Sequence, residues 1–205
     1  MTIRSLRINL IVLQLVFLVT GLLACTAQET IPSVGPDEGI NLELVREVEA
    51  ITDQQVQKIA FVEMLTIEEK TFFFKKRIVG KIQTLPLTTE QRDHLTVLLA
   101  NMSPEVYTNS ARSRKSESFL TAWTETGKEI FDEAVLSDIV ASISPLGSEK
   151  DKTKLAAPPK TKCGCATSSD WCSDGYGCTY IPSCNTEGCG TLFACTCNGR
   201  CDRIL

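Results

Sequence analysis

Cysteine is the residue type in this chain whose number and spacing carry the most chemistry. Nine of the ten cysteines in the 205 residues lie between Cys163 and Cys201, separated in turn by 1, 6, 5, 5, 4, 5, 1 and 3 residues. None of these gaps is C-x-x-C, the spacing typical of thioredoxin-type redox pairs and zinc ribbons, and the segment has no histidine. We therefore predict disulfides there. A metal–thiolate cluster is the less favoured alternative, and no cofactor is predicted.

The N-terminus has the pattern of an export signal. Arg4 and Arg7 precede an apolar run from Leu10 to Leu23, which has the length of a signal peptide core and is short for a membrane span. The sequence L-L-A-C at the end of this run is typical of a bacterial lipobox, so we predict a signal peptide at 1–24 and lipidation of Cys25. Plain secretion with cleavage after Ala27 is one alternative, and a retained helix is the other.

Either form of cleavage takes the rest of the chain out of the cytoplasm, where disulfides are the default state of cysteine pairs. We expect a cell-envelope lipoprotein, a protein secreted after cleavage, or both. The membrane is then a predicted partner through the lipid anchor at Cys25, and residues 25–36 are predicted to be a tether, since they are polar and contain Pro32, Gly35 and Pro36.

Residues 37–144, called here the helical domain, are predicted to form four to six helices. Glycine and proline are scarce and the apolar residues recur at helical spacing. Thr66–Glu69 and Thr88–Gln91 have the form of capping boxes, and one helix should end before Pro86.

Finer expectations within the helical domain concern its boundaries and its core. Leu42, Val45, Val48 and Ile51 are expected on one core-facing stripe, which Val56, Ile59 and Ala60 are expected to continue. The polar, basic stretch 109–118 is expected to connect helices, and a single helical run is expected from Phe119 to Ile143. The lone histidine, His94, is expected to be a surface residue.

Residues 145–162 are predicted to be a cleavable linker. They contain three prolines, with five lysines against two acidic residues, and exposed segments of this kind are preferred cleavage sites. Lys160 and Lys162 stand just before Cys163, so a trypsin-like processing protease could release the cysteine-rich C-terminal segment.

Residues 163–205, called here the cysteine module, are too few to build a sufficient apolar core without covalent staples. Asn198–Gly199 is a tight-turn dipeptide, and Leu192–Cys197 before it is a candidate strand. Four acidic residues against two arginines give the module a net charge of −2, unlike cationic membrane-lysing peptides. The aromatic residues are either its core or its contact surface: Trp171, Tyr176, Tyr180 and Phe193.

The predicted fold class is mostly α: a small helical domain after a signal or lipoprotein peptide, then a small disulfide-rich module of loops and short strands. No catalytic motif stands out, so an enzyme is not predicted. The absence of a basic excess also argues against a nucleic-acid partner.

The cysteine frame resembles that of the fulvocin C-related bacteriocin precursors. The shared elements are C-x-C at Cys163 and Cys165, S-D-aromatic-C ending at Cys172, five-residue gaps through Cys178 and Cys184, and C-x-C-N-G from Cys195. They cover about a fifth of the chain. The resemblance implies a small secreted antibacterial peptide in which all eight framework cysteines are paired: Cys163, Cys165, Cys172, Cys178, Cys184, Cys189, Cys195 and Cys197. Cys201 has no counterpart there and is the expected free or intermolecular thiol.

These observations predict an exported precursor of a bacteriocin-like peptide, 163–205, carried by a helical prodomain and directed at an unknown bacterial envelope target. The alternative is an unprocessed surface lipoprotein whose cysteine-rich tail is a structural or binding module.

Overall fold

The computed structural model describes residues 39–108, 111–143, 163–172 and 175–204. The predicted signal peptide, Cys25 with its tether, and the linker with Lys160 and Lys162 lie outside the described residues. Among the helices that are described, none combines the length and the apolar character needed to cross a membrane.

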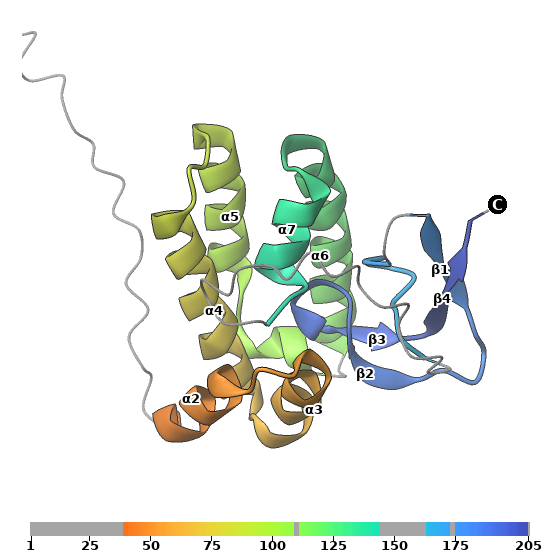
Figure 1. The fold of residues 1–205 in the computed structure, drawn as a ribbon, viewed down its shortest axis with the longest axis horizontal. Helices are drawn as coiled ribbons and strands as arrows, with labels where there is room; N and C mark the ends of the chain where they lie inside the picture. The colour runs from red at the N-terminus through yellow and green to blue at the C-terminus, as the bar shows by residue number, and fades with distance from the viewer. Residues whose placement is uncertain (1–38, 109–110, 144–162, 173–174, 205) are drawn as a thin grey trace, which may run out of the picture. The chain divides into compact units, whose positions relative to one another are not determined.

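The prediction of a mostly helical protein is confirmed (Figure 1). The described residues form six α-helices, at the upper end of the predicted four to six, with a short 3₁₀ helix between the fourth and the fifth. Their bounds are α2 Leu42–Ala50, α3 Gln54–Met64, α4 Ile67–Thr84, α5 Thr89–Asn101, η1 Pro104–Tyr107, α6 Ala111–Ile130 and α7 Glu133–Val140.

Both predicted capping boxes are present. The Thr66 hydroxyl accepts from the Glu69 amide and the Glu69 carboxylate accepts from the Thr66 amide, and Thr88 and Gln91 make the same exchange at the start of α5. Each box satisfies two amide groups that a helix start leaves without partners. Helix α4 ends at Thr84, before Pro86 as expected.

Two predicted boundaries are wrong. The stretch 111–118 is the first part of α6 and not a connection, because a polar sequence forms helix readily where one side faces solvent, as Lys115 and Ser118 do. The run expected from 119 to 143 is broken after Ile130. There the Asp132 carboxylate accepts from the amides of Ala134 and Val135 and starts α7 as its N-cap.

The core of the helical domain is aromatic and aliphatic. Its largest fully buried side chains include Phe61, Phe73, Phe74, Ile78, Leu95, Leu98, Leu120, Leu136 and Ile139. The prediction that Val56 and Ile59 face this core is wrong, since they are 53% and 56% exposed, whereas Ala60, predicted on the same stripe, is buried together with Gln57 and Phe61. Buried Gln57 donates to the Val48 carbonyl and joins α3 to α2.

His94 is not the free surface residue that was expected. Its ring is half-buried and stacks on the Trp123 ring with centroids 4.3 Å apart. Nε2 of His94 donates to the Trp123 carbonyl, and the Trp123 indole donates to the His94 carbonyl. Burial lowers the pKa of His94, against smaller raising effects from that hydrogen bond and from Glu90. The pair joins α5 to α6.

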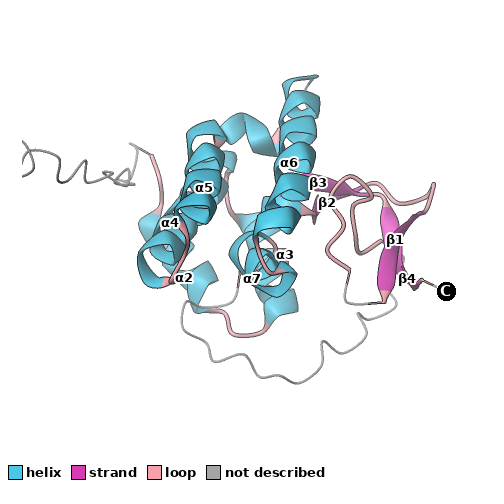
Figure 2. Ribbon diagram, turned by 90° about the horizontal axis from the view of Figure 1, so that it is seen from above, coloured by secondary structure: helices cyan, strands magenta, loops and turns pink. Residues whose placement is uncertain are grey.

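The cysteine module forms two small antiparallel ladders (Figures 1 and 2). Strand β1, Tyr176–Tyr180, pairs with β4, Gly199–Arg203, and β2, Thr186–Cys189, pairs with β3, Cys195–Cys197. The 3₁₀ turn η2, Thr191–Phe193, connects β2 and β3. In both views the β2–β3 ladder lies beside the helices and β1–β4 lies farther from them.

The expected tight turn at Asn198–Gly199 is not formed. The strand before it is shorter than predicted, and β3 and β4 belong to different ladders, so this dipeptide carries the chain from one ladder to the other. Gly199 is needed for close packing: a Cβ there would lie 2.6 Å from Cys178 Sγ and 2.7 Å from the Thr179 carbonyl oxygen.

Candidate functional site

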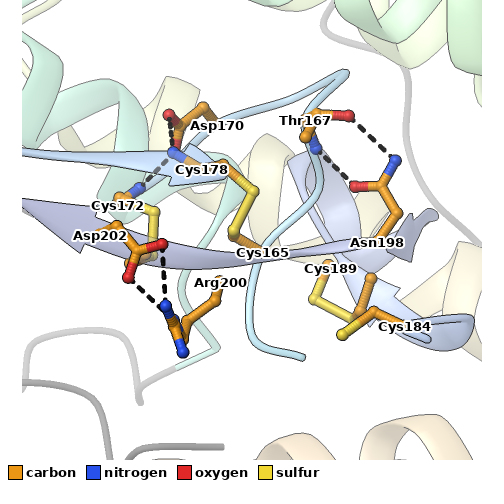
Figure 3. Close-up of a disulfide and its surroundings, with 12 residues drawn as sticks. Cys165, Thr167, Asp170, Cys172, Cys178, Cys184, Cys189, Asn198, Arg200 and Asp202 are labelled. Carbon is orange, nitrogen blue, oxygen red and sulfur yellow. Dashed lines mark hydrogen bonds and ion pairs between the residues drawn. A yellow bond between two sulfur atoms is a disulfide. The ribbon is translucent and has the colours of Figure 1, made fainter. Parts of the chain in front are cut away.

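Four disulfides hold the cysteine module together. They join Cys163 to Cys184, Cys165 to Cys178, Cys172 to Cys201 and Cys189 to Cys197, and Figure 3 shows the region where several of them lie close together. All four begin and end within the module, and none reaches a described residue of the helical domain. Disulfides of this number are typical of proteins that leave the reducing cytoplasm, and they indicate an exported protein.

The predicted status of two cysteines is wrong. Cys201, expected to have no partner in the chain, is bonded to Cys172, and Cys195, expected in the framework, is the unpaired cysteine of the described residues. Neither ladder bonds its directly opposed cysteines. Cys201 lies opposite Cys178 at the centre of β1–β4 but bonds to Cys172. Cys195 lies opposite Cys189, whose sulfur bonds instead to Cys197, two residues after Cys195 on β3.

The structure also bears on the metal alternative. The sulfur atoms of Cys165, Cys172 and Cys201 lie within 4.8 Å of one another, which is close enough for a shared ion. Each of them is already in a disulfide, and a disulfide sulfur is not the thiolate that a zinc site needs. In the oxidised protein this group is two adjacent disulfides.

Two polar side chains order the loops between the disulfides (Figure 3). The Asp170 carboxylate accepts from the amides of Cys172 and Cys178 at 2.9 and 2.8 Å. The Asn198 amide group makes a two-way pair with Thr167, accepting from its backbone amide and donating to its hydroxyl. Asp170 and Asn198 belong to the S-D-aromatic-C and C-N-G parts of the cysteine frame, so these positions have a structural role inside the module.

The module contacts the helical domain through η2, through the loop around Ser168 and Asp170, and through β2. Thr191 and Leu192 have no solvent exposure. Leu192 and Phe193 both have positive φ angles, 59° and 53°, a left-handed conformation that costs a bulky residue of the order of 1 kcal/mol or more. Two such residues in succession persist only where surrounding contacts hold them.

Phe193 supplies the aromatic part of that contact. Its ring lies edge-on to Phe61 of α3 and Phe74 of α4, with centroids 5.9 and 6.0 Å away, and the Lys58 ammonium lies 5.2 Å from its centroid. Burial lowers the pKa of Lys58. Pairs of this kind each contribute about 0.5–1.5 kcal/mol beyond area burial.

A buried hydroxyl network crosses the same contact. Thr124 of α6 shares a hydrogen bond of 2.7 Å with Thr191, whose hydroxyl also bonds Ser169 at 2.8 Å and accepts from the Trp171 indole at 3.1 Å. The Ser169 hydroxyl in turn accepts from the Thr191 amide. Because these groups are buried, loss of one partner leaves another unsatisfied.

Further polar contacts surround this centre. Tyr107 donates to the Leu192 carbonyl, Thr121 donates to the Ser168 carbonyl, and the Ser168 hydroxyl donates to Glu117. Lys128 lies 5.5 Å from the Trp171 ring centroid and donates to the Asp170 carbonyl. At Gly188 the module backbone comes so close to α3 that a Cβ would lie 2.6 Å from Val62 Cγ2.

The unpaired thiol lies at this contact. Cys195 is 2% exposed, and burial, with a smaller effect of the Glu117 charge, raises its pKa to about 12. Burial also raises the pKa of Tyr107, with a contribution from Cys195. A thiol with so high a pKa is almost entirely protonated at neutral pH and reacts slowly.

The structure divides the four aromatic residues whose role was open. Trp171 and Phe193 contact side chains of the helical domain, while Tyr176 and Tyr180 on β1 are 37% and 61% exposed. The helical side of the contact, above all Thr121 and Thr124, was not predicted from the sequence. Only their successive positions on one side of α6 could have pointed to them, and nothing in that spacing indicates a partner.

No known protein family, curated protein or solved structure matches this chain.

Proposed function

We propose that this chain is an exported precursor of a disulfide-stapled, bacteriocin-like antibacterial peptide, with the helical domain as its carrier. The observation that carries the proposal is that the four disulfides are confined to residues 163–201. The module is therefore covalently complete without the helical domain. Cleavage within 145–162 would leave it with every disulfide intact.

The docking of η2 supports the role of the helical domain as a carrier. Leu192 and Phe193 would be the most apolar part of the free module, and in the precursor they lie against the helices. A carrier that covers this segment keeps it from contacting other molecules before release. The antibacterial part of the proposal rests on the resemblance of the cysteine frame to the fulvocin C-related precursors.

The surface lipoprotein is the second candidate, and the same docking favours it. Full burial of Thr191 and Leu192 is also what a permanently joined pair of units would show. In that case the exposed Tyr176 and Tyr180 of β1 are the residues available to a binding partner, and no cleavage takes place after export.

Non-reducing intact-mass spectrometry on the culture supernatant and the membrane fraction separates the two. The precursor function predicts a supernatant species that begins near Cys163 and is eight hydrogens lighter than its reduced form, two for each of the four disulfides. Growth inhibition of a panel of bacteria by that purified species then tests the activity. A single full-length acylated species in the membrane contradicts the precursor function and supports the lipoprotein.

A further inference from the structure

We infer that the helical domain is a binding site for the cysteine module that persists after the linker is cut. The two parts then form a noncovalent complex, and cleavage alone does not free the module. This inference rests on the proposed function, since it concerns the cut precursor, and it adds a step: the segment Thr191–Phe193 must be withdrawn from the helices before the module acts elsewhere.

The hydrogen bonds across the contact support a specific interface. Six are found among the described residues, joining Tyr107 to Leu192, Thr121 to Ser168, Glu117 to Ser168, Thr124 to Thr191, Lys128 to Asp170 and the Lys58 ammonium to the Cys189 sulfur. At one hydrogen bond per 100–200 Å², this number corresponds to an interface of about 600–1,200 Å². That is the size of a weak or transient specific interface, below the standard size of about 1,200–2,000 Å².

The centre of the contact has the form of a binding hot spot. An aromatic ring, Phe193, packs against the adjoining rings of Phe61 and Phe74, two residues from the buried pair Thr124–Thr191. Hot spots combine such an anchor with desolvated polar pairs, and a few of them carry most of the binding free energy. The positive φ angles of Leu192 and Phe193 fit the same view, because contacts with the helices are what hold that conformation.

None of these contacts depends on the linker. An intact linker holds the two parts at an effective concentration of about a millimolar, and cutting it removes that advantage without removing any contact. A helical domain that remains at the producing cell would therefore bind free modules again. It would act as a capture site as well as a carrier.

The test uses the full oxidised chain with a specific protease site placed within residues 145–162. The chain is cut and passed over a size-exclusion column without reductant at about 10 µM, and the dissociation constant is then measured by dilution. We expect the two fragments to elute together. Immediate separation of the wild-type fragments at this concentration overturns the inference.

Two pairs of variants locate the site. Phe193→Ala should raise the dissociation constant at least about thirtyfold, as expected of a hot-spot aromatic residue, while Tyr180→Ala, an exposed aromatic on β1, should change it less than about twofold. On the helical side, Thr124→Val should weaken binding about tenfold. Thr126→Val, which alters an exposed threonine of the same helix, is its control. If the two variants of either pair change the dissociation constant equally, the assigned binding site is wrong.

Each variant is accepted only if its mass before cutting shows four disulfides. If Phe193→Ala fails to oxidise, Thr124→Val remains informative, because Thr124 is outside the cysteine module. Alkylation of Cys195 is a second readout: its rate should stay as slow in the cut complex as in the uncut chain and should rise in the variants that undock.

The inference and the proposed function fail separately. A module that stays bound after the cut but inhibits no bacterium leaves the capture site standing and removes the antibacterial function. A module that separates at once removes the capture site and leaves the precursor function open.

Discussion

The helical domain and the cysteine module are held together by different physical means. The helical domain buries large aromatic and aliphatic side chains, such as Phe73, Ile78 and Leu136. Among the described residues of the module, most of the buried apolar side chains are cysteines, and Leu192 is the one large aliphatic side chain that is fully buried. A segment this short therefore replaces an apolar core with covalent bonds, and directs its most apolar residues to a neighbouring domain.

Chemical reduction of the disulfides should give the largest effect and tests this difference between the two parts most directly. Each disulfide stabilises a small domain by typically 2–4 kcal/mol, and the module has four, while no disulfide is found in the described residues of the helical domain. We expect a reductant to unfold residues 163–204 and leave helices α2–α7 folded. Far-UV circular dichroism should keep its helical signal while hydrogen exchange of the module becomes fast.

Loss of the helical signal at the same reductant concentration would contradict this difference between the helical domain and the cysteine module. It would mean that the helical domain depends on the module as much as the module depends on its disulfides.

A smaller and sharper test compares two cysteines. Cys201→Ser removes the disulfide that closes 29 residues and should cost about 3–4 kcal/mol, with a mass that shows three disulfides or a scrambled mixture. Cys195→Ser changes the buried unpaired thiol and should keep all four disulfides, at a cost of about 1 kcal/mol for burying a more polar hydroxyl. Peptide mapping without reductant gives the pairing in each variant.

The opposite result, in which Cys201→Ser oxidises cleanly and Cys195→Ser scrambles, would restore the pairing that the family resemblance implied. It would also remove Cys195 as a reporter of docking.

The smallest expected effect concerns pH and belongs to the helical domain. Burial lowers the pKa of His94 below its ordinary value of 6.5, so the folded protein binds fewer protons than the unfolded chain in the interval between the two values. The stability that results is present above pH 6.5 and is lost as pH falls through the lowered pKa. We expect a loss below about 1 kcal/mol between pH 7 and 5, because the ring is only half-buried.

Urea unfolding of the helical signal at several pH values measures this loss. His94→Gln should flatten the dependence in this range while keeping a side chain that can donate to the Trp123 carbonyl. An unchanged pH dependence in the variant would show that another group is responsible.

The features that were predicted correctly are those decided by neighbours in the chain. Thr66 and Thr88 start helices because a hydroxyl three residues before a Glu or Gln can complete a capping box by itself. The predicted staples of the module likewise result from its size and from the number of its cysteines. Predictions of which side of a helix is buried were only partly correct. Val45, Val48 and Ala60 are buried as predicted, whereas Val56 and Ile59 are exposed and His94 stacks on Trp123.

The number and crowding of the cysteines are enough to predict that residues 163–204 carry disulfides, but the pairing depends on how the chain folds. Nine cysteines with one unpaired allow 945 pairings, and spacing does not rank them. Which of Cys195 and Cys201 stays unpaired depends on contacts formed in the folded chain, such as the pairing of β1 with β4 and the Cys172–Cys201 bond, which join residues far apart in the chain. The docking of Thr191–Phe193 on α3, α4 and α6 is decided in the same way, because side chains from four separate segments must meet before any one of them is buried.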